Sequence, residues 1–415
     1  MRNLRYKIII LSVVLLGFSS IGTSQSLDSL LQLVVDNNPE LKALQLEYEA
    51  ELQKVDQVSQ LPNPEIGIGV PVLRPETRLG PQMLMVSASQ MFPWFGTFKS
   101  TKDVVISMSK AKYERIAAVK LNLYNIVKIA YYQLNFLNEK ADILTEFLVI
   151  YGTLESVALA KVESGQSTLA DVLRIQLKLQ EFEQELNLIE NQKLMYDAQI
   201  NDVTVQSFDT KIKISDDLSN APILNFNLDE YQKQIKEHHP LMVKIDNEIE
   251  VSKNKQAVNS SINKPKIGIG IDYSLVGQRT DANPEFNGRD IFIPKVKVSI
   301  PIYRKSYRAK NEEEALYQKS LEMQKLSIEN KFLGLLLKYK SDYDNAILRV
   351  ELNNQQIETT QMAYEVLLAK YSSTGKDFDD LLQIQNQLIA YKLGLKMEKL
   401  IAFIAVANVN RLTDY

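Results

Sequence analysis

The chain has 415 residues, with 48 Lys or Arg against 51 Asp or Glu, so its formal net charge is −3. This near-neutral charge argues against a nucleic-acid-binding protein, which would carry a strong basic excess. With no Cys and only two His, the sequence excludes disulfides, thiolate metal sites, a Cys nucleophile and a lipid anchor on Cys, and it nearly excludes a His-based triad or metal cage. The average composition, 45% hydrophobic and 24% charged, is that of an ordinary soluble protein of two or three domains.

Residues 1–24 have the pattern of a secretory signal peptide. Three basic residues precede an apolar run over residues 8–18, and small residues follow it. The run is too short to span a bilayer as a helix, so we expect cleavage before Gln25. The alternative is the apolar terminus of a cytosolic protein. No later segment has about 18 uninterrupted apolar residues, so we expect an exported chain that could cross a membrane only as a β-barrel.

Two long spans without proline are predicted to be long helices. No proline occurs in residues 94–221 or 302–415, and proline breaks helix interiors. Within these spans, apolar residues recur at alternating steps of four and three from Leu123 to Tyr151 and from Phe332 to Tyr371. This spacing is typical of a coiled-coil seam.

Each span is interrupted once by glycine, at Gly165 and at Gly375. Glycine ends helices because it adopts the left-handed conformation without strain. Ser167 or Thr168, and Asp377, are the candidate N-caps of the helices that follow. The spans are therefore predicted to be helical hairpins, about 97–208 and 305–410. Each first arm is about 65 residues, roughly 100 Å long at 1.5 Å per residue, which requires neighbouring helices of the same kind.

The sequence contains an internal twofold repeat. The blocks that recur in the same order are Asn38-Pro39 with His239-Pro240, Pro64-Glu65-Ile66-Gly67-Ile68-Gly69 with Pro265-Lys266-Ile267-Gly268-Ile269-Gly270, Pro93 with Pro301, and Asp171-Val172-Leu173 with Asp380-Leu381-Leu382. We predict a first repeat over residues 25–208, a linker over 209–227 and a second repeat over 228–415. Each repeat has a helix, a β-hairpin and a helical hairpin.

The β-hairpins are expected at about 65–93 and about 266–303. Apolar residues alternate with small or polar ones there, as in a barrel strand with one face to lipid and the other to a lumen. The stretch Met83–Met91 alternates less clearly. Four strands cannot close a barrel, so strands must come from several chains. The alternative is two amphipathic hairpins on a soluble protein.

These features together resemble the TolC-type outer membrane efflux family. The resemblance is carried by the signal peptide, the repeat, the Pro-x-x-Gly-x-Gly blocks, the segment Ser89-Gln90-Met91-Phe92-Pro93-Trp94-Phe95-Gly96 and the segment Gly165-Gln166-Ser167-Thr168-Leu169-Ala170-Asp171-Val172-Leu173. It implies a mainly α fold with a membrane β-barrel: a homotrimer in which long coiled-coil hairpins form an α-barrel and four strands per chain join a shared 12-stranded β-barrel.

The same resemblance implies roles for residues near the glycine turns. The periplasmic hairpin tips that contact an adaptor would be formed by Gly165, Gln166, Ser167, Gly375 and Lys376. The pore aperture would be lined by residues from Asp171, Asp377, Asp379 and Asp380; the second copy is one residue shorter here, so which of its Asp residues lines the pore stays open. N-capping of the return helices is the alternative role for the Asp residues of the second copy. Lys370, Lys376 or Arg174 could form ion pairs that hold the tip closed.

Aromatic residues follow the predicted strands. We expect a membrane-interface anchor formed by Trp94, Phe95 and Tyr303, because aromatic residues are enriched at such interfaces. Stacking on a ligand is the alternative for Trp94. Met83, Met85 and Met91 are expected to pack in the barrel or face lipid, with soft-metal handling as the alternative.

Two further polar groups are expected to be structural. For His238-His239 we expect a solvated turn at a helix start, with a metal contact as the alternative. The run Lys310–Glu314 is expected to be a solvated helix face.

We find no catalytic or nucleotide-binding motif and therefore predict a protein that is not an enzyme, with no cofactor and no metal site. The predicted function is the outer membrane channel of a tripartite efflux or type I secretion system in a Gram-negative bacterium, with a large periplasmic part. Its expected partners are a periplasmic adaptor, an inner membrane transporter of the RND or ABC type, and outer membrane lipid. A periplasmic adaptor and an extracellular coiled-coil structural protein are the alternatives. Drugs, metal ions and peptides all stay open as cargo.

Overall fold

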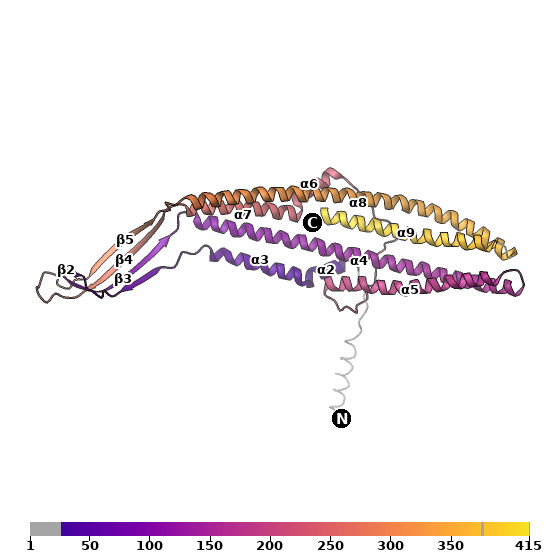
Figure 1. Cartoon of the computed structure of the whole chain (residues 1–415), viewed down its shortest axis with the longest axis horizontal. Helices are drawn as coiled ribbons and strands as arrows, with labels where there is room; N and C mark the ends of the chain where they lie inside the picture. The colour runs from indigo at the N-terminus through magenta and orange to yellow at the C-terminus, as the bar shows by residue number, and fades with distance from the viewer. Residues whose placement is uncertain (1–25, 375–376, 415) are drawn as a thin grey trace, which may run out of the picture. The chain divides into compact units, whose positions relative to one another are not determined.

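The computed structural model describes residues 26–374 and 377–414. The predicted signal peptide, residues 1–24, and the residues Gly375 and Lys376 lie outside this part. In chain order (Figure 1), the elements are α2 (Leu27–Asn37), α3 (Pro39–Gln57), β1 (Glu65–Gly69), β2 (Glu76–Thr77), β3 (Gly80–Phe92), α4 (Thr97–Glu163), α5 (Leu169–Thr204), α6 (Leu228–His238), α7 (Pro240–Ile262), β4 (Lys266–Val276), β5 (Ile291–Ser299), α8 (Lys305–Thr374) and α9 (Phe378–Thr413).

The chain is mostly helical with a small antiparallel sheet, as predicted. Two short helices, antiparallel strands, one very long helix and a return helix follow one another in residues 27–204 and again in residues 228–413. The long helices α4 and α8 have 67 and 70 residues, and the return helices α5 and α9 have 36 each.

The described residues form two compact units. Unit 1 holds the chain up to Leu41, Val119–Gln232, and the chain from Leu333 onward. Unit 2 holds Lys42–Ala118 and Lys233–Phe332.

In unit 1, the return helices run beside the later parts of the long helices, α5 with α4 and α9 with α8 (Figure 1). The α4 residues of the predicted seam are buried: Val127 and Tyr151 are fully buried, and Leu134, Leu137 and Leu144 are each 3% exposed. Of these, Leu137, Leu144 and Tyr151 join one core cluster with residues of the other three helices, including Ile175, Phe182, Leu381 and Leu388. The seam is thus the core of the unit, and hydrophobic burial holds the four helices together.

Helix α4 also contains an 18-residue window with a mean hydropathy of 1.6, of which a third is buried. By length and composition this window is apolar enough to cross a membrane. The sequence prediction differed because it counted only uninterrupted apolar residues. The buried seam gives a physical reason for this hydropathy, since α4 packs apolar side chains against α5, α8 and α9.

The predicted linker 209–227 is fixed by side chains of unit 1. Asn201 donates from Nδ2 to the Thr210 carbonyl at 2.7 Å, and Asp197 accepts from the Ile212 amide at 3.1 Å. Further along, the hydroxyl of Tyr343 on α8 donates to the Pro222 carbonyl at 2.9 Å. The linker therefore joins α5 to α8.

In unit 2, the antiparallel strands pair in the order β1-β3-β4-β5, and β2 adds to the end of β3. The register puts Ile66 opposite Ala88, Ala88 opposite Ile271, and Ile271 opposite Pro294. Because side chains alternate between faces, one face of the sheet is apolar. The opposite face carries Met85, Ser87 and Ser89 of β3, Asp272 of β4, and Lys295 and Lys297 of β5.

This pairing shows on which face of the sheet most residues of the less regular stretch Met83–Met91 lie. Met85 and Met91 lie on the polar face of β3, a strand of 13 residues, whereas Met83 lies at a register shift between Gln82 and Leu84. The apolar face is exposed: Ile66 and Ile68 are each 73% exposed and Val296 is 72% exposed. Exposed apolar patches mark contact surfaces for protein or membrane.

Two expectations for unit 2 are corrected. The run Lys310–Glu314 is not wholly solvated, because Glu314 is only 1% exposed and accepts a hydrogen bond from Ser252 Oγ at 2.9 Å. His238 is exposed, but His239 is 4% exposed and is no solvated turn residue. Its Nδ1 accepts from the Leu241 amide at 3.1 Å and caps α7, and its ring lies 4.6 Å from that of Phe332.

Asn38 caps α3 in the same way. Its Oδ1 accepts from the amides of Glu40 and Leu41 at 3.0 and 3.2 Å, while its Nδ2 donates to the Val203 carbonyl of α5 at 2.9 Å. We predict that Asn38→Ala destabilises the start of α3 by about 1–2 kcal/mol, because N-caps contribute about that much and the buried Val203 carbonyl loses its donor. Hydrogen exchange measured by mass spectrometry should show amides at the start of α3 exchanging about tenfold faster.

Ser26→Ala is the matched control, since Ser26 caps α2 with a longer bond of 3.3 Å at an exposed site. Its effect should be smaller and confined to α2. Unchanged exchange in the first turn of α3 of the Asn38→Ala protein would contradict the assigned role of Asn38.

Candidate functional site

The candidate site is the end of the four-helix core of unit 1 at which α4 turns into α5 and α8 is followed by α9 (Figure 1). Helix α4 ends in a Schellman motif. Gly165 has φ +73°, its amide donates to the Val162 carbonyl at 3.0 Å, and the Gln166 amide donates to the Lys161 carbonyl at 2.8 Å. Only glycine adopts this backbone conformation without strain, so Gly165 is the turn residue that the sequence predicted.

Asp171 closes the start of α5. Its carboxylate accepts from the Ser167 hydroxyl at 2.7 Å and from the Thr168 amide at 3.2 Å. This is the reciprocal arrangement of a capping box, with Thr168 as the N-cap. Asp171 is half-buried and its carboxylate caps the first turn of α5, so its contacts assign it a structural role.

The acidic residues of the second turn are held by cations. Lys370 of α8 forms an ion pair with Asp377, and Arg174 of α5 forms an ion pair with Asp379 of α9. The carboxylate of Asp377 raises the pKa of Lys370 above its usual value. Asp377 has φ +66° and makes no side-chain cap of α9, so the expected N-cap bond is missing. Asp380 is exposed and has no ion pair within the described residues.

A buried cation lies beneath this turn. Lys161 of α4 is 8% exposed, its ammonium donates to the Ser372 carbonyl at 3.2 Å, and it lies 5.4 Å from the ring centre of Tyr371. Tyr371 is fully buried, and burial raises the pKa of its phenol. Lys161 therefore ties the end of α4 to the end of α8. The sequence analysis missed it, because a single Lys in an amphipathic helix gives no signal.

Equivalent glutamines of the two return helices differ in their partners. Gln176 of α5 is half-buried and donates to Glu155 Oε1 at 2.7 Å. Gln385 of α9 is the counterpart of Gln176 in the predicted repeat. It is fully buried, and within the described residues neither its Nε2 nor its Oε1 has a hydrogen-bond partner. An unsatisfied buried polar group destabilises a fold, so α9 is packed less favourably than α5 at this level.

Several apolar side chains of α5 and α8 are exposed in the part of the chain that the structure describes. Leu169, Leu173 and Leu177 of α5 are spaced by four residues, so they lie on one face, and each is more than half exposed. On α8, Leu348, Leu352, Met362 and Val366 are also more than half exposed.

The predicted anchor residues lie in unit 2, where strands lead into long helices. Trp94 and Phe95 lie between β3 and α4, with ring centres 6.1 Å apart in an edge-on arrangement. Tyr303 lies between β5 and α8. Phe95 and Tyr303 are 86% and 83% exposed. Among the described residues there is no group of three or more His, Asp or Glu side chains that could hold a metal ion.

Comparison with known proteins identifies the architecture. Residues 30–202 match the family model described as outer membrane efflux protein. This segment, which is less than half of the chain, is similar to outer membrane efflux proteins. The TolC-type resemblance stated from the sequence is thereby confirmed, together with the fold. A search of the curated proteins finds no match.

Solved structures of membrane proteins share the fold along nearly the whole chain. A membrane protein from Pseudomonas aeruginosa is 14% identical, with 93% of each chain covered and a TM-score of 0.73. The outer membrane protein VceC from Vibrio cholerae is 12% identical, covering 93% of this chain and 95% of its own, with a TM-score of 0.70. The outer membrane channel CmeC from Campylobacter jejuni is 13% identical, covering 93% and 85%, with a TM-score of 0.71.

We predict that Gln385→Leu stabilises α9 by about 1–3 kcal/mol, because an apolar side chain of similar size removes two unsatisfied buried groups. Hydrogen exchange of the α9 amides near residue 385 should slow by about tenfold or more. Gln176→Leu is the matched control and should have the opposite sign, since it breaks the bond to Glu155. Faster exchange in the Gln385→Leu protein would show that Gln385 has a stabilising partner.

Proposed function

We propose that the protein is the outer membrane channel of a tripartite efflux or type I secretion system, a passive and gated exit duct from the periplasm to the exterior. The observation that carries this proposal is the match of residues 30–202 to outer membrane efflux proteins, joined to a fold shared with outer membrane channels. The exposed apolar face of the sheet in unit 2 supports insertion of this part into lipid.

A homotrimer is supported by surfaces that one chain leaves uncovered. The strands β1 and β5 are the edges of the sheet, and open edges are not tolerated in a bilayer. Three copies of the strands β1, β3, β4 and β5 would give the twelve strands of a closed barrel with a lumen. The exposed apolar side chains of α5 and α8 likewise fit helices of neighbouring copies in an α-barrel.

The two alternatives are less well supported. A periplasmic adaptor would be built on one helical hairpin, whereas this chain has two, α4–α5 and α8–α9. An extracellular coiled-coil protein gives no reason for a sheet whose apolar face is exposed.

The hairpin ends would be the periplasmic tip. In this proposal Gly165, Gln166, Ser167, Gly375 and Lys376 contact the adaptor, and the aperture is lined by acidic residues. Because Asp171 is engaged in a cap and Asp377 and Asp379 are ion-paired, Asp380 is the carboxylate best placed to supply free negative charge. In a trimer, such a residue would form a ring of three carboxylates that attracts cations.

Trp94, Phe95 and Tyr303 would lie at the periplasmic membrane interface, where exposed aromatic rings are favoured. The energy would come from an inner membrane transporter of the RND or ABC type through a periplasmic adaptor. The chain itself would perform no chemistry.

The test is conductance of the purified protein in planar bilayers, where we expect discrete channels that are mostly closed. Asp379→Asn removes the ion pair with Arg174 and should raise the open probability. An exposed pair contributes about 0.2–1 kcal/mol, so the increase should be up to about fivefold.

Two further proteins control this prediction. Exchanging the charges, as Arg174→Asp with Asp379→Arg, should restore the low open probability. Glu163→Gln removes an exposed charge near the same turn that forms no ion pair within the described residues, and it should leave opening unchanged. Absence of any conductance from a folded trimer would overturn the channel proposal, whereas conductance that is insensitive to Asp379→Asn would overturn only the ion-pair latch.

A further inference from the structure

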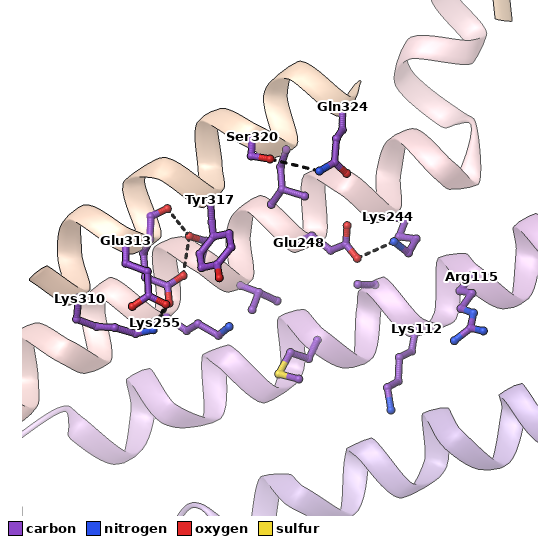
Figure 2. Close-up of a pocket in the computed structure, with 16 residues that line it drawn as sticks. Lys112, Arg115, Lys244, Glu248, Lys255, Lys310, Glu313, Tyr317, Ser320 and Gln324 are labelled. Carbon is purple, nitrogen blue, oxygen red and sulfur yellow. Dashed lines mark hydrogen bonds and ion pairs between the residues drawn. The ribbon is translucent and has the colours of Figure 1, made fainter. Parts of the chain in front are cut away.

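The contact between α7 and α8 in unit 2 is polar where paired helices are ordinarily apolar. On α7, Ser252, Gln256 and Asn259 are spaced by four and three residues, so they lie on one face of the helix. Each of them donates a side-chain hydrogen bond to α8. We call these three residues and their bonds the polar ladder, and the bonds of one residue a rung. Figure 2 shows α7 and α8 side by side in this region, near the labelled Lys310 and Glu313.

The rung closest to the sheet is made by Asn259, in the last turn of α7 before it ends at Ile262. The Asn259 Nδ2 donates to the Tyr307 carbonyl at 2.8 Å and to Asn311 Oδ1 at 2.7 Å. Tyr307 lies in the first turn of α8. Asn259 therefore joins the end of one helix to the start of the other, next to the strands.

The other two rungs lie further from the sheet. The Gln256 Nε2 donates to the Asn311 carbonyl at 2.9 Å, and its Oε1 accepts from Gln318 Nε2 at 3.2 Å. The Ser252 hydroxyl donates to Glu314 Oε2 at 2.9 Å and accepts from Gln318 Nε2 at 3.3 Å. Ser252 and Glu314 are 3% and 1% exposed. A leucine seam packs again after a shift along the helix, whereas polar partners of this kind meet in one alignment only.

The strands that continue these helices do not define their own register on the apolar face. Ile269 of β4 lies opposite Val296 of β5. A shift of two residues would bring Val298 or Pro294 opposite Ile269. Every side chain would then keep its face, because side chains alternate with a period of two.

Contacts elsewhere in the hairpin add little to the choice of register. Lys295 forms an ion pair with Asp272, its diagonal neighbour, and a shift of two residues would place the two directly opposite. The connection between β4 and β5 is long, so no tight turn defines the pairing. At its end, Asp290 accepts from the Val276 amide and the Tyr273 hydroxyl, so one carboxylate holds that end.

Short connections couple the strands to the helices. Residues 263–265 join α7 to β4, and residues 300–304 join β5 to α8. Each connection contains a proline, which restricts its backbone. A shift of two residues would displace one strand by roughly 7 Å. The connection from α7 spans at most about 10 Å when fully extended, so α7 would have to move with the strand.

From these contacts we infer that the polar ladder is a positioning device: it fixes α7 against α8 along their axes and thereby fixes the register of β4 against β5. Asn259 is the main positioning residue, because its rung is closest to the strands. Since β5 is an edge of the sheet, this register also sets which residues a neighbouring copy would meet in the proposed assembly. The inference concerns a single chain and goes beyond the proposed function, so its failure would leave the channel proposal standing.

The test uses cysteine pairs as reporters of register, since the chain has no Cys. Ile269→Cys with Val296→Cys reports the observed register. Ile269→Cys with Val298→Cys, or with Pro294→Cys, reports a shift of two residues in either direction. The full-length protein in detergent is equilibrated with reduced and oxidised glutathione, and a maleimide mass shift measures the fraction of each disulfide. Its ratio between the observed and the shifted pairs is the readout.

Replacing the ladder by apolar side chains should keep the helices packed and remove their alignment. The triple substitution Ser252→Ala, Gln256→Leu and Asn259→Leu should lower the ratio by about tenfold or more, because several hydrogen bonds are lost. Asn259→Ala alone should lower it by about threefold, which corresponds to one net hydrogen bond. Lys253→Leu with Ser260→Ala is the matched control at exposed positions of α7, and it should leave the ratio unchanged.

An unchanged ratio in a triply substituted protein whose α7 amides still resist hydrogen exchange would overturn the inference. If that protein does not fold, Asn259→Ala decides the question, and an unchanged ratio there has the same meaning. A larger fall for Asp290→Ala than for Asn259→Ala would assign the register to the connection between the strands, and this would also overturn the inference.

Discussion

The structure depends on one constraint, which is that the long helices can be stabilised only by side-to-side packing of an apolar seam. Helices α4 and α8 are 67 and 70 residues long, and no compact core can surround them. They are held instead by seam residues such as Leu137, Leu144 and Tyr151, which pack against α5, α8 and α9. Each helix is therefore buried on one stripe only. The other apolar stripes of α5 and α8 remain open for further helices.

The sheet, like the helices, leaves part of its apolar surface uncovered within one chain. Its strands pair through a regular antiparallel register, but β1 and β5 have free edges and the apolar face is exposed. An average composition like that of a soluble protein hides this, because the exposed apolar sheet is a small part of a chain that is otherwise made of water-compatible helices. Both the helices and the sheet thus leave surfaces that the proposed assembly of copies around a common axis would cover.

The sequence predicted the parts of the fold that follow from periodicity and from turn chemistry. The seam spacing located the long helices, and Gly165 located the turn between α4 and α5. Contacts between residues far apart in the sequence were not predictable in this way. Spacing could not show that Asp171 closes its own helix, that Asp379 pairs with Arg174 some two hundred residues away, or that Lys161 is buried against Tyr371.

Burial of single polar residues was the main source of error. Glu314 and His239 occur in segments that read as solvated, yet one is held by Ser252 and Lys310 and the other caps α7. Gln385 and Gln176 have the same place in the predicted repeats, but within the described residues only Gln176 has a carboxylate partner. The return helices α5 and α9 therefore differ in how these glutamines are paired, a difference that no local pattern encodes.

The most direct test of the account is whether the free edges of the sheet pair between copies. Because the chain has no Cys, single cysteines introduced in place of exposed residues of β1 and β5, for example Ile68→Cys with Val296→Cys and its neighbours in register, can be oxidised on an otherwise unreactive background. We predict that at least one such pair gives a covalent species on a denaturing gel that stops at three chains. A ladder that continues beyond three chains, or no cross-link in any register, would contradict the closed trimer.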